Sequence, residues 1–298
     1  MQAIKFLPTP STDMGLCKQQ LSHGSRSFYF ASHLLPKVTQ HAACGLYAFC
    51  READDMVDEG ENPQNALDIL HHRLDRIYEG KPLYKATDRV LTQIVQTYNM
   101  PRELLNALLE GFAWDAEGKI YHSIDDVYDY SARVAGTVGV MMSVLMGVRD
   151  PKILARAADL GTAMQLTNIA RDVGEDARLG RIYLPLDELR AEGVDPAQML
   201  ADPTFNSGIG RVVRRLLERA DWLYQRSDHG IAQLPRKYQP GIRAARKLYA
   251  AIGEKVNALD CNSVDQRAIV GTSRKFALLT SAVALAQPRS HALDAPAL

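Results

Sequence analysis

The sequence predicts an all-α protein in which a single helical domain surrounds a central cleft. Three observations support this prediction. Helix-capping side chains precede prolines at several places, long stretches carry apolar residues at helical spacing, and alternating β-branched runs between turns are missing. We expect about ten helices, with no long flexible linker and no internal repeat of solenoid length.

Helix starts are marked at four places along the chain. Three of them are an Asn or Asp followed by a proline: Asn62-Pro63, Asp150-Pro151 and Asp195-Pro196. The first residue of each pair can cap the helix, and the fixed φ of the proline suits the first helical turn. Ser123 and Asp126 resemble a capping box in which aspartate replaces the usual glutamate.

Between these starts, apolar residues recur with the period of a helix. Residues 104–112 and 212–220 carry leucine, valine and phenylalanine at spacings of three and four. Residues 134–148 are almost continuously apolar but are interrupted by glycines and hydroxyls, and they are too short to span a membrane. This last segment is interpreted as a buried core helix, and a transient contact with a membrane surface stays open.

The composition sets limits on the class of protein. The 298 residues are 46% hydrophobic, enough for a large core, and we expect one all-α domain over residues 1–298 with a frayed tail at 288–298. Lys+Arg and Asp+Glu are both 35, so bulk charge gives no indication of a nucleic-acid partner. No secretory signal is evident at the amino terminus. The four cysteines form no CxxC pair, which suits a reducing cytosol, and we expect a cytoplasmic protein.

The candidate chemistry begins with a polar stripe in the segment YAFCREADDMVD at residues 47–58. At about 100° per residue, Tyr47, Arg51, Asp54 and Asp58 fall on one narrow face of a helix. The other faces of this helix are mostly apolar. Oxygen-bearing side chains therefore occupy the positions where a core helix would carry leucine.

A second stripe of the same kind lies in QLTNIARDVGED at residues 165–176. Gln165, Asn168, Asp172 and Asp176 share one face, and both stripes contain the motif Asp-x-x-x-Asp. Carboxylates four residues apart on a helix are about 5–6 Å apart at Cβ and can share a cation. Oxygen ligands without His or Cys favour Mg²⁺, with Mn²⁺ as an alternative. Two such stripes facing each other predict a diphosphate held through metal ions between two helices.

Three other interpretations of these residues agree less well with the sequence. A single Asp-x-x-x-Asp usually marks a solvated helix face, but solvated faces mix in Lys and Glu, which these stripes lack. A di-iron bundle would need a pair of Glu-x-x-His motifs, and none is found. The glycines Gly208 and Gly210 lack the third glycine and the strand of a dinucleotide site. The paired stripes therefore favour a metal–diphosphate site.

Four strings in the chain resemble the squalene/phytoene synthase family of head-to-head prenyltransferases. They are SRSFYFASHLLP (25–36), YAFCREADDMVDE (47–59), RVAGTVG (133–139) and QLTNIARDVGEDARLGRIYLP (165–185). The resemblance covers about residues 22–286 and is most pronounced toward bacterial phytoene synthases of carotenoid biosynthesis. It implies the isoprenoid synthase fold and a magnesium-dependent transferase.

The resemblance also implies roles for individual residues. It assigns metal binding to Asp54, Asp58, Asn168, Asp172 and Asp176. It assigns catalysis to the four aspartates with Arg51 and Tyr183. It assigns substrate binding to Ser25, Arg26, Ser27, Tyr47, Arg51, Tyr130, Gln165, Asn168, Arg171, Arg181 and Tyr249, with His23 as a helper. From the residues alone, the three tyrosines Tyr130, Tyr183 and Tyr249 could equally pack at helix contacts.

The implied reaction joins two molecules of geranylgeranyl diphosphate through prephytoene diphosphate to give phytoene and release diphosphate. It needs no hydride, so no nicotinamide cofactor is expected, and the final proton acceptor stays open between a tyrosine and the released diphosphate. No obligate protein partner is inferred. Two alternatives stay open: a squalene or dehydrosqualene synthase that uses farnesyl diphosphate, and a catalytically silent helical protein that binds prenyl lipids. Glycines 136, 139 and 147 serve either close helix packing or room for the prenyl chain.

Overall fold

The computed structural model describes residues 11–58 and 62–284, and within these ranges the fold is all-α, as predicted. The amino-terminal stretch and the predicted tail at 288–298 lie outside the described residues. The first half contains α1 (Ser11–Gly24), α2 (Arg26–Ser32), α3 (Lys37–Asp58), α4 (Pro63–Tyr78), α5 (Ala86–Tyr98), α6 (Arg102–Ala116) and α7 (Ile124–Ser131). The second half contains η1 (Ala132–Gly136), α8 (Thr137–Leu145), α9 (Pro151–Arg178), α10 (Leu186–Ala191), α11 (Pro196–Ala201), α12 (Ser207–Gln233), α13 (Gln239–Asn257) and α14 (Thr272–Ala284).

The described residues form more helices than the ten or so expected from the sequence. The additional ones are short, such as α10 and α11 with six residues each, because one or two turns do not show a helical period. All four predicted helix starts are confirmed. Asn62 caps α4, Asp150 caps α9 and Asp195 caps α11 through side-chain bonds of 2.8–3.1 Å to backbone N–H groups. Ser123 and Asp126 form a complete capping box at α7.

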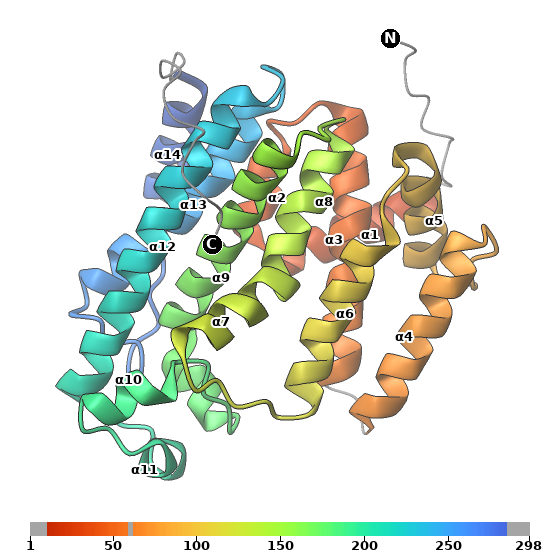
Figure 1. Ribbon diagram of the computed structural model, residues 1–298. Coiled ribbons are helices and arrows are strands. Elements are labelled where there is room, and N and C mark those ends of the chain that lie inside the picture. Colours follow the sequence, from red (N-terminus) through yellow and green to blue (C-terminus); the bar gives the residue numbers. More distant parts are fainter. Residues whose placement is uncertain (1–10, 59–61, 285–298) are drawn as a thin grey trace.

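Two hydrophobic cores lie side by side, and Phe28 and Val134 pack against both of them. One core is built around α9, α12 and α13, where α12 packs along the whole of α9. The other is built around α3, α5 and α6. In Figure 1, α12, α13 and α14 lie on one side of α8 and α9, and α4, α5 and α6 lie on the other side. The long helix α3 belongs to one core and the long helix α9 to the other, and both contribute side chains to the cavity between the cores.

Two glycines allow the backbones of η1 and α8 to come into direct contact with the backbone of α9. A Cβ on Gly139 would lie 2.1 Å from the Ala157 carbonyl oxygen, and a Cβ on Gly161 would lie 2.1 Å from that of Ala135. Only glycine can occupy such positions without movement of the backbone. Gly147 has a different role, since it has a φ of +80° and open space around it, and it simply ends the segment after α8.

The predicted core helix at 134–148 is present but does not begin as one regular helix. Residues Ala132–Gly136 form a π-helical turn, which is followed by α8. A π turn is a local widening that is typical of functional sites and has no distinctive sequence period. Among the described residues, no helix combines the length and the apolar character needed to cross a bilayer. All four cysteines are free thiols.

Candidate active site

A cavity of about 410 Å³ lies between the two cores and is the centre of the candidate site. Toward the carboxyl end of both long helices, the lining changes from mainly apolar to polar. On α3 the lining runs from Ala43 to Asp54, and on α9 it runs from Ile153 to Asn168. At about 1.5 Å per residue, the lined stretch of α9 is roughly 20 Å long. The cavity is therefore a channel with a polar mouth and an apolar interior.

The far end of the channel is closed by a small separate hydrophobic cluster. Leu35, Met146 and Leu234 are buried members of this cluster and also line the channel. Ile153 and Ile242 pack against the same cluster from α9 and α13. A long hydrocarbon chain is the kind of ligand that such an apolar end accommodates.

The first predicted stripe lies on α3 at the mouth of the channel. Tyr47, Arg51 and Asp54 line the channel, while Asp58 is the last residue of the helix. Arg51 bonds Asp54 at 3.1 Å and Asp55 at 2.5 Å. Burial and then the neighbouring Asp58 carboxylate raise the pKa of Asp54 to about 7, although Arg51 acts in the opposite direction. The stripe therefore holds more negative charge than its own arginine compensates.

The second predicted stripe lies on α9, across the channel from the first. Gln165 and Asn168 line the channel, and the Asn168 amide donates to the Gln165 side-chain oxygen at 3.3 Å. The remaining oxygen of Asn168 is buried and has no hydrogen-bond partner among the described residues. Burial, followed by the charge of Asp172, raises the pKa of Asp176 to about 7. This side of the channel therefore holds one buried acceptor without a partner among the described residues.

Three arginines surround the aspartates. Arg171 bonds its neighbour Asp172 through Nε at 2.8 Å, and Arg181 bonds Asp58 at 3.0 Å. Arg267 bonds Asp172 at 3.2 Å. Arg171 and Arg181 were predicted from the sequence, whereas Arg267 was not. Arg267 follows α13 in a segment with no helical period, so no spacing connects it with the second stripe.

Two of the predicted tyrosines meet at an aspartate that the sequence analysis did not single out. Tyr130 and Tyr183 donate to the two oxygens of Asp115, at 2.7 and 2.8 Å. Asp115 stands near the end of α6, and its burial raises its pKa to about 6 although the two hydroxyls act in the opposite direction. Tyr130 also lines the channel. A single aspartate among apolar helix residues gives no signal in the sequence.

The predicted amino-terminal phosphate segment lies partly at the site. Ser25 caps α2 by accepting from the Phe28 N–H at 3.3 Å, and its side chain hydrogen-bonds Tyr249, which lines the channel. Ser27 is half-buried and Arg26 is exposed, and neither lines the channel. His23, expected as a helper, is exposed and its Nδ1 bonds the Gln19 carbonyl oxygen at 2.8 Å. The structure therefore brings Ser25 to the site but not these neighbours.

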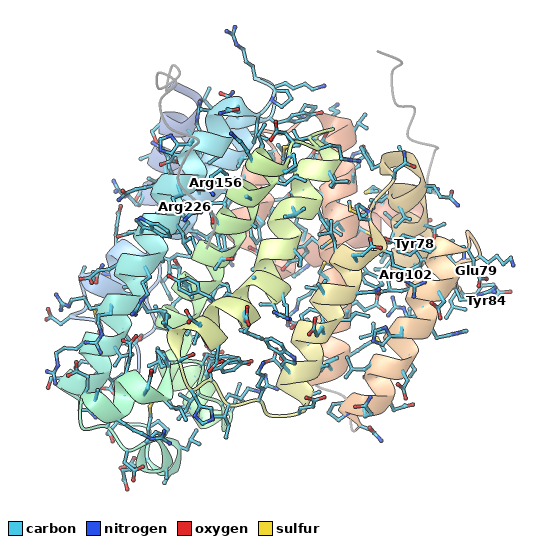
Figure 2. All side chains as sticks on the ribbon, in the orientation of Figure 1. Tyr78, Glu79, Tyr84, Arg102, Arg156 and Arg226 are labelled. Atoms are coloured by element: carbon cyan, nitrogen blue, oxygen red, sulfur yellow. The ribbon has the colours of Figure 1, made fainter. Side chains whose placement is uncertain are left out.

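One charged group lies deeper along the channel. Arg156 of α9 lines the channel, and Arg156 and Arg226 of α12 share the carboxylate of Asp159 at 3.2 and 3.1 Å. Figure 2 shows these two arginines near each other where α9 and α12 pack. This cluster joins α9 to α12, and because one carboxylate serves two guanidinium groups it leaves one net positive charge beside the channel.

The donor set at the mouth fits a hard divalent cation. All the predicted ligands are oxygen donors, and the buried Asn168 oxygen without a partner faces the same channel as Asp54. Among the described residues, no three carboxylates, histidines or cysteines converge on one point. Mg²⁺ commonly takes one or two carboxylates and completes its shell with water and substrate phosphates. The site therefore fits a metal that is held jointly by the protein and a phosphorylated ligand.

Comparisons with known proteins agree with this geometry. A family model described as squalene/phytoene synthase matches residues 21–274. The chain is 50% identical to a phytoene synthase of Rhodobacter capsulatus, over 95% of this chain and 87% of the relative. It is 48% identical to a phytoene synthase of Cereibacter sphaeroides, over 90% and 79%. A crystal structure of a dehydrosqualene synthase is similar with a TM-score of 0.84 and 31% identity, covering 91% of this chain and 95% of that one.

Proposed function

The chain belongs to the squalene/phytoene synthase family, and we infer that it is a prenyltransferase that joins two molecules of geranylgeranyl diphosphate head to head to give phytoene. The observation that carries this inference is the channel itself. Two oxygen-bearing stripes flank its mouth, and a deep apolar interior follows behind them. A diphosphate at the mouth would place its prenyl chain in that interior.

The proposed metal is Mg²⁺, held by Asp54 and Asp58 on one side and by Asn168, Asp172 and Asp176 on the other. When bound, it would neutralise the diphosphate as negative charge develops on this leaving group. The raised pKa values of Asp54 and Asp176 support this proposal, because crowded carboxylates need a compensating cation.

The chain's own residues bind and orient the diphosphate group. Three arginines at the mouth each bond a carboxylate already: Arg51, Arg171 and Arg181. A bound diphosphate would share each arginine with that carboxylate or take the place of the carboxylate. Their guanidinium groups match phosphate oxygens in geometry and keep their charge at any working pH. By holding the leaving group, they favour cleavage of the allylic C–O bond over its re-formation.

The apolar wall protects the cation that this cleavage leaves. Water would trap an allylic cation, and the interior beyond Asp54 and Asn168 is lined mainly by aliphatic and aromatic side chains. The double bond of the second substrate can then attack the cation, and loss of a proton closes the cyclopropane ring of prephytoene diphosphate. A second C–O cleavage, rearrangement and loss of a proton give phytoene.

Farnesyl diphosphate is the second candidate substrate, because the solved relative with 31% identity is a dehydrosqualene synthase. The two candidates are separated by supplying each diphosphate alone at equal concentration and comparing kcat/KM for hydrocarbon formation. We expect geranylgeranyl diphosphate to be preferred by at least about tenfold, since each unfilled group in an apolar pocket costs binding energy. A preference for farnesyl diphosphate would overturn the chain-length assignment.

A further inference from the structure

Asp115 lies behind the wall of the channel rather than in it. It does not line the channel, whereas Tyr130, which bonds it, does. Its two carboxylate oxygens are each occupied by a tyrosine hydroxyl, Tyr130 at 2.7 Å and Tyr183 at 2.8 Å. Tyr130 is therefore the direct link between Asp115 and the channel, and the charges of Arg181 and Asp58 at the mouth also act on Asp115.

The direction of these two hydrogen bonds follows from the chemistry of the groups. An ionised carboxylate can only accept, so both phenols must donate their protons to Asp115. A phenol that donates to a carboxylate has a more electron-rich ring than a free phenol, because the bond shifts electron density onto oxygen and from there to the ring. Tyr130 thus lines the channel while its hydroxyl is bound to Asp115.

The surrounding rings hold this arrangement in place. The ring of Tyr130 stacks on that of Tyr183 with centroids 5.2 Å apart, and Tyr121 packs against both at 5.2 and 5.7 Å. Tyr121 and Tyr130 are almost fully buried. Burial strengthens the hydrogen bonds to Asp115 and restricts the rotation of the rings. The angle of the Tyr130 ring toward the channel is therefore set by Asp115 and by two neighbouring tyrosines.

We propose that Asp115 is a positioning residue that holds the ring of Tyr130 as an electron-rich wall against the carbocations of the reaction. This rests on the proposed function, which places cationic carbon in the channel. The face of an aromatic ring attracts a cation, and more so where water is excluded. Asp115 stabilises the cation through Tyr130, and its own charge also acts on Asp54 and Arg181 at the mouth.

The test is a double-mutant cycle of Asp115→Asn and Tyr130→Phe, read as phytoene formation with geranylgeranyl diphosphate and magnesium. Asparagine keeps the shape of aspartate but offers one acceptor oxygen instead of two, and Phe keeps the ring without the hydroxyl. We expect each single variant to lower kcat by roughly thirtyfold, with KM within about threefold of the parent. If Asp115 acts through Tyr130, the double variant is no more than about threefold worse than the worse single variant.

Two further variants keep the test decisive if Asp115→Asn does not fold. Tyr183→Phe leaves the bond between Asp115 and Tyr130 intact, so we expect it to lose less activity than Tyr130→Phe. Glu117→Gln, exposed at the end of the same helix, and Tyr128→Phe, on the same helix as Tyr130 but outside the channel, are the matched controls and should behave like the parent. The melting-temperature rise caused by magnesium and inorganic diphosphate should be the same in Tyr130→Phe and in both control variants as in the parent.

Three outcomes would overturn the proposal: effects of Asp115→Asn and Tyr130→Phe that multiply, a loss confined to KM, or a greater loss in Tyr183→Phe than in Tyr130→Phe. The cycle is measured on whichever prenyl hydrocarbon the parent protein forms. A parent that converts only farnesyl diphosphate would therefore refute the substrate assignment and leave the test of Asp115 intact.

Discussion

Arg181 donates to the carboxylate of Asp58 at 3.0 Å, although 123 positions separate the two residues in the chain. The bond joins the segment that follows the second stripe to the last residue of the first stripe. Both side chains are partly exposed, so the pair contributes little to stability by itself. Its importance is geometric, because it places a guanidinium group between the two sets of aspartates where a diphosphate would lie.

Removing one aspartate from either stripe should abolish turnover without unfolding the protein. We expect Asp54→Ala and Asp172→Ala each to lower kcat by at least about a thousandfold, on the order of 4 kcal/mol of transition-state stabilisation. Asp68→Ala, at an exposed position of α4, is the control and should keep full activity. Steady-state assays and circular dichroism of the three variants check this, and near-normal turnover of either site variant would contradict the assignment.

Substitution of the outer aspartate of each stripe should impair the second half-reaction more than the first. Asp58 is the last residue of α3, and Asp176 lies one turn beyond Asp172 on α9, while of these four aspartates only Asp54 lines the channel. The second C–O cleavage starts from an intermediate already held inside, so its demands on the outer aspartates differ from those of the first. We expect Asp58→Ala or Asp176→Ala to retain some condensation and to accumulate prephytoene diphosphate while phytoene falls. Product extraction from each variant checks this, and a parallel loss of both species would refute the division.

The stability of the metal-free protein should fall as the pH rises toward neutrality. Asp54 and Asp176 have pKa values raised from 3.8 to about 7, so the folded state keeps protons that the unfolded chain has already released. Stability is therefore lost from about pH 4 up to about pH 7 and levels off above that. Thermal melts across this range in a chelating buffer measure the effect.

The same reasoning predicts what Asp54→Asn does to the melting temperature of the metal-free protein. The variant should melt higher than the parent at pH 8, and the difference should narrow toward pH 4, because asparagine carries no charge to crowd Asp58. An Asp54→Asn variant that melts lower than the parent at pH 8 would show that the carboxylates do not repel each other as described.

Backbone contact between η1 and α9 should make Gly161 intolerant of a side chain. A methyl group there would lie 2.1 Å from the Ala135 carbonyl oxygen, so we expect Gly161→Ala to cost about 1–3 kcal/mol and to distort the channel wall. Gly15→Ala is the control, since nothing lies within 4 Å of that position and alanine favours a helix. Urea unfolding of both variants measures the difference, and equal stability would refute the close approach.

What the sequence predicts correctly lies mostly within single helices. The stripe from Tyr47 to Asp58 could be predicted because one helix fixes the relative directions of its own side chains. The same is true of Gln165 to Asp176 and of the caps at Asn62 and Asp150. These relations depend on local geometry, which the chain encodes within a few residues.

What the sequence could not show depends on contacts between distant segments. Asp115 becomes recognisable only when α7 and the segment after α9 bring two tyrosine hydroxyls to it, and Arg267 only when the segment after α13 reaches Asp172. The π turn at Ala132–Gly136 likewise follows from packing against α9 and has no period of its own. Tertiary packing, not local pattern, places these groups.

The most direct test of the account is the identity of the product that the purified protein forms from geranylgeranyl diphosphate. With magnesium present, we predict phytoene, with two diphosphates released for each phytoene molecule, and no hydrocarbon once a chelator has removed the metal. Extraction with chromatography and mass spectrometry identifies the hydrocarbon, and a phosphate assay counts the diphosphate. Absence of phytoene with magnesium, or undiminished formation after chelation, would contradict the assignment of the two aspartate stripes to a metal–diphosphate site.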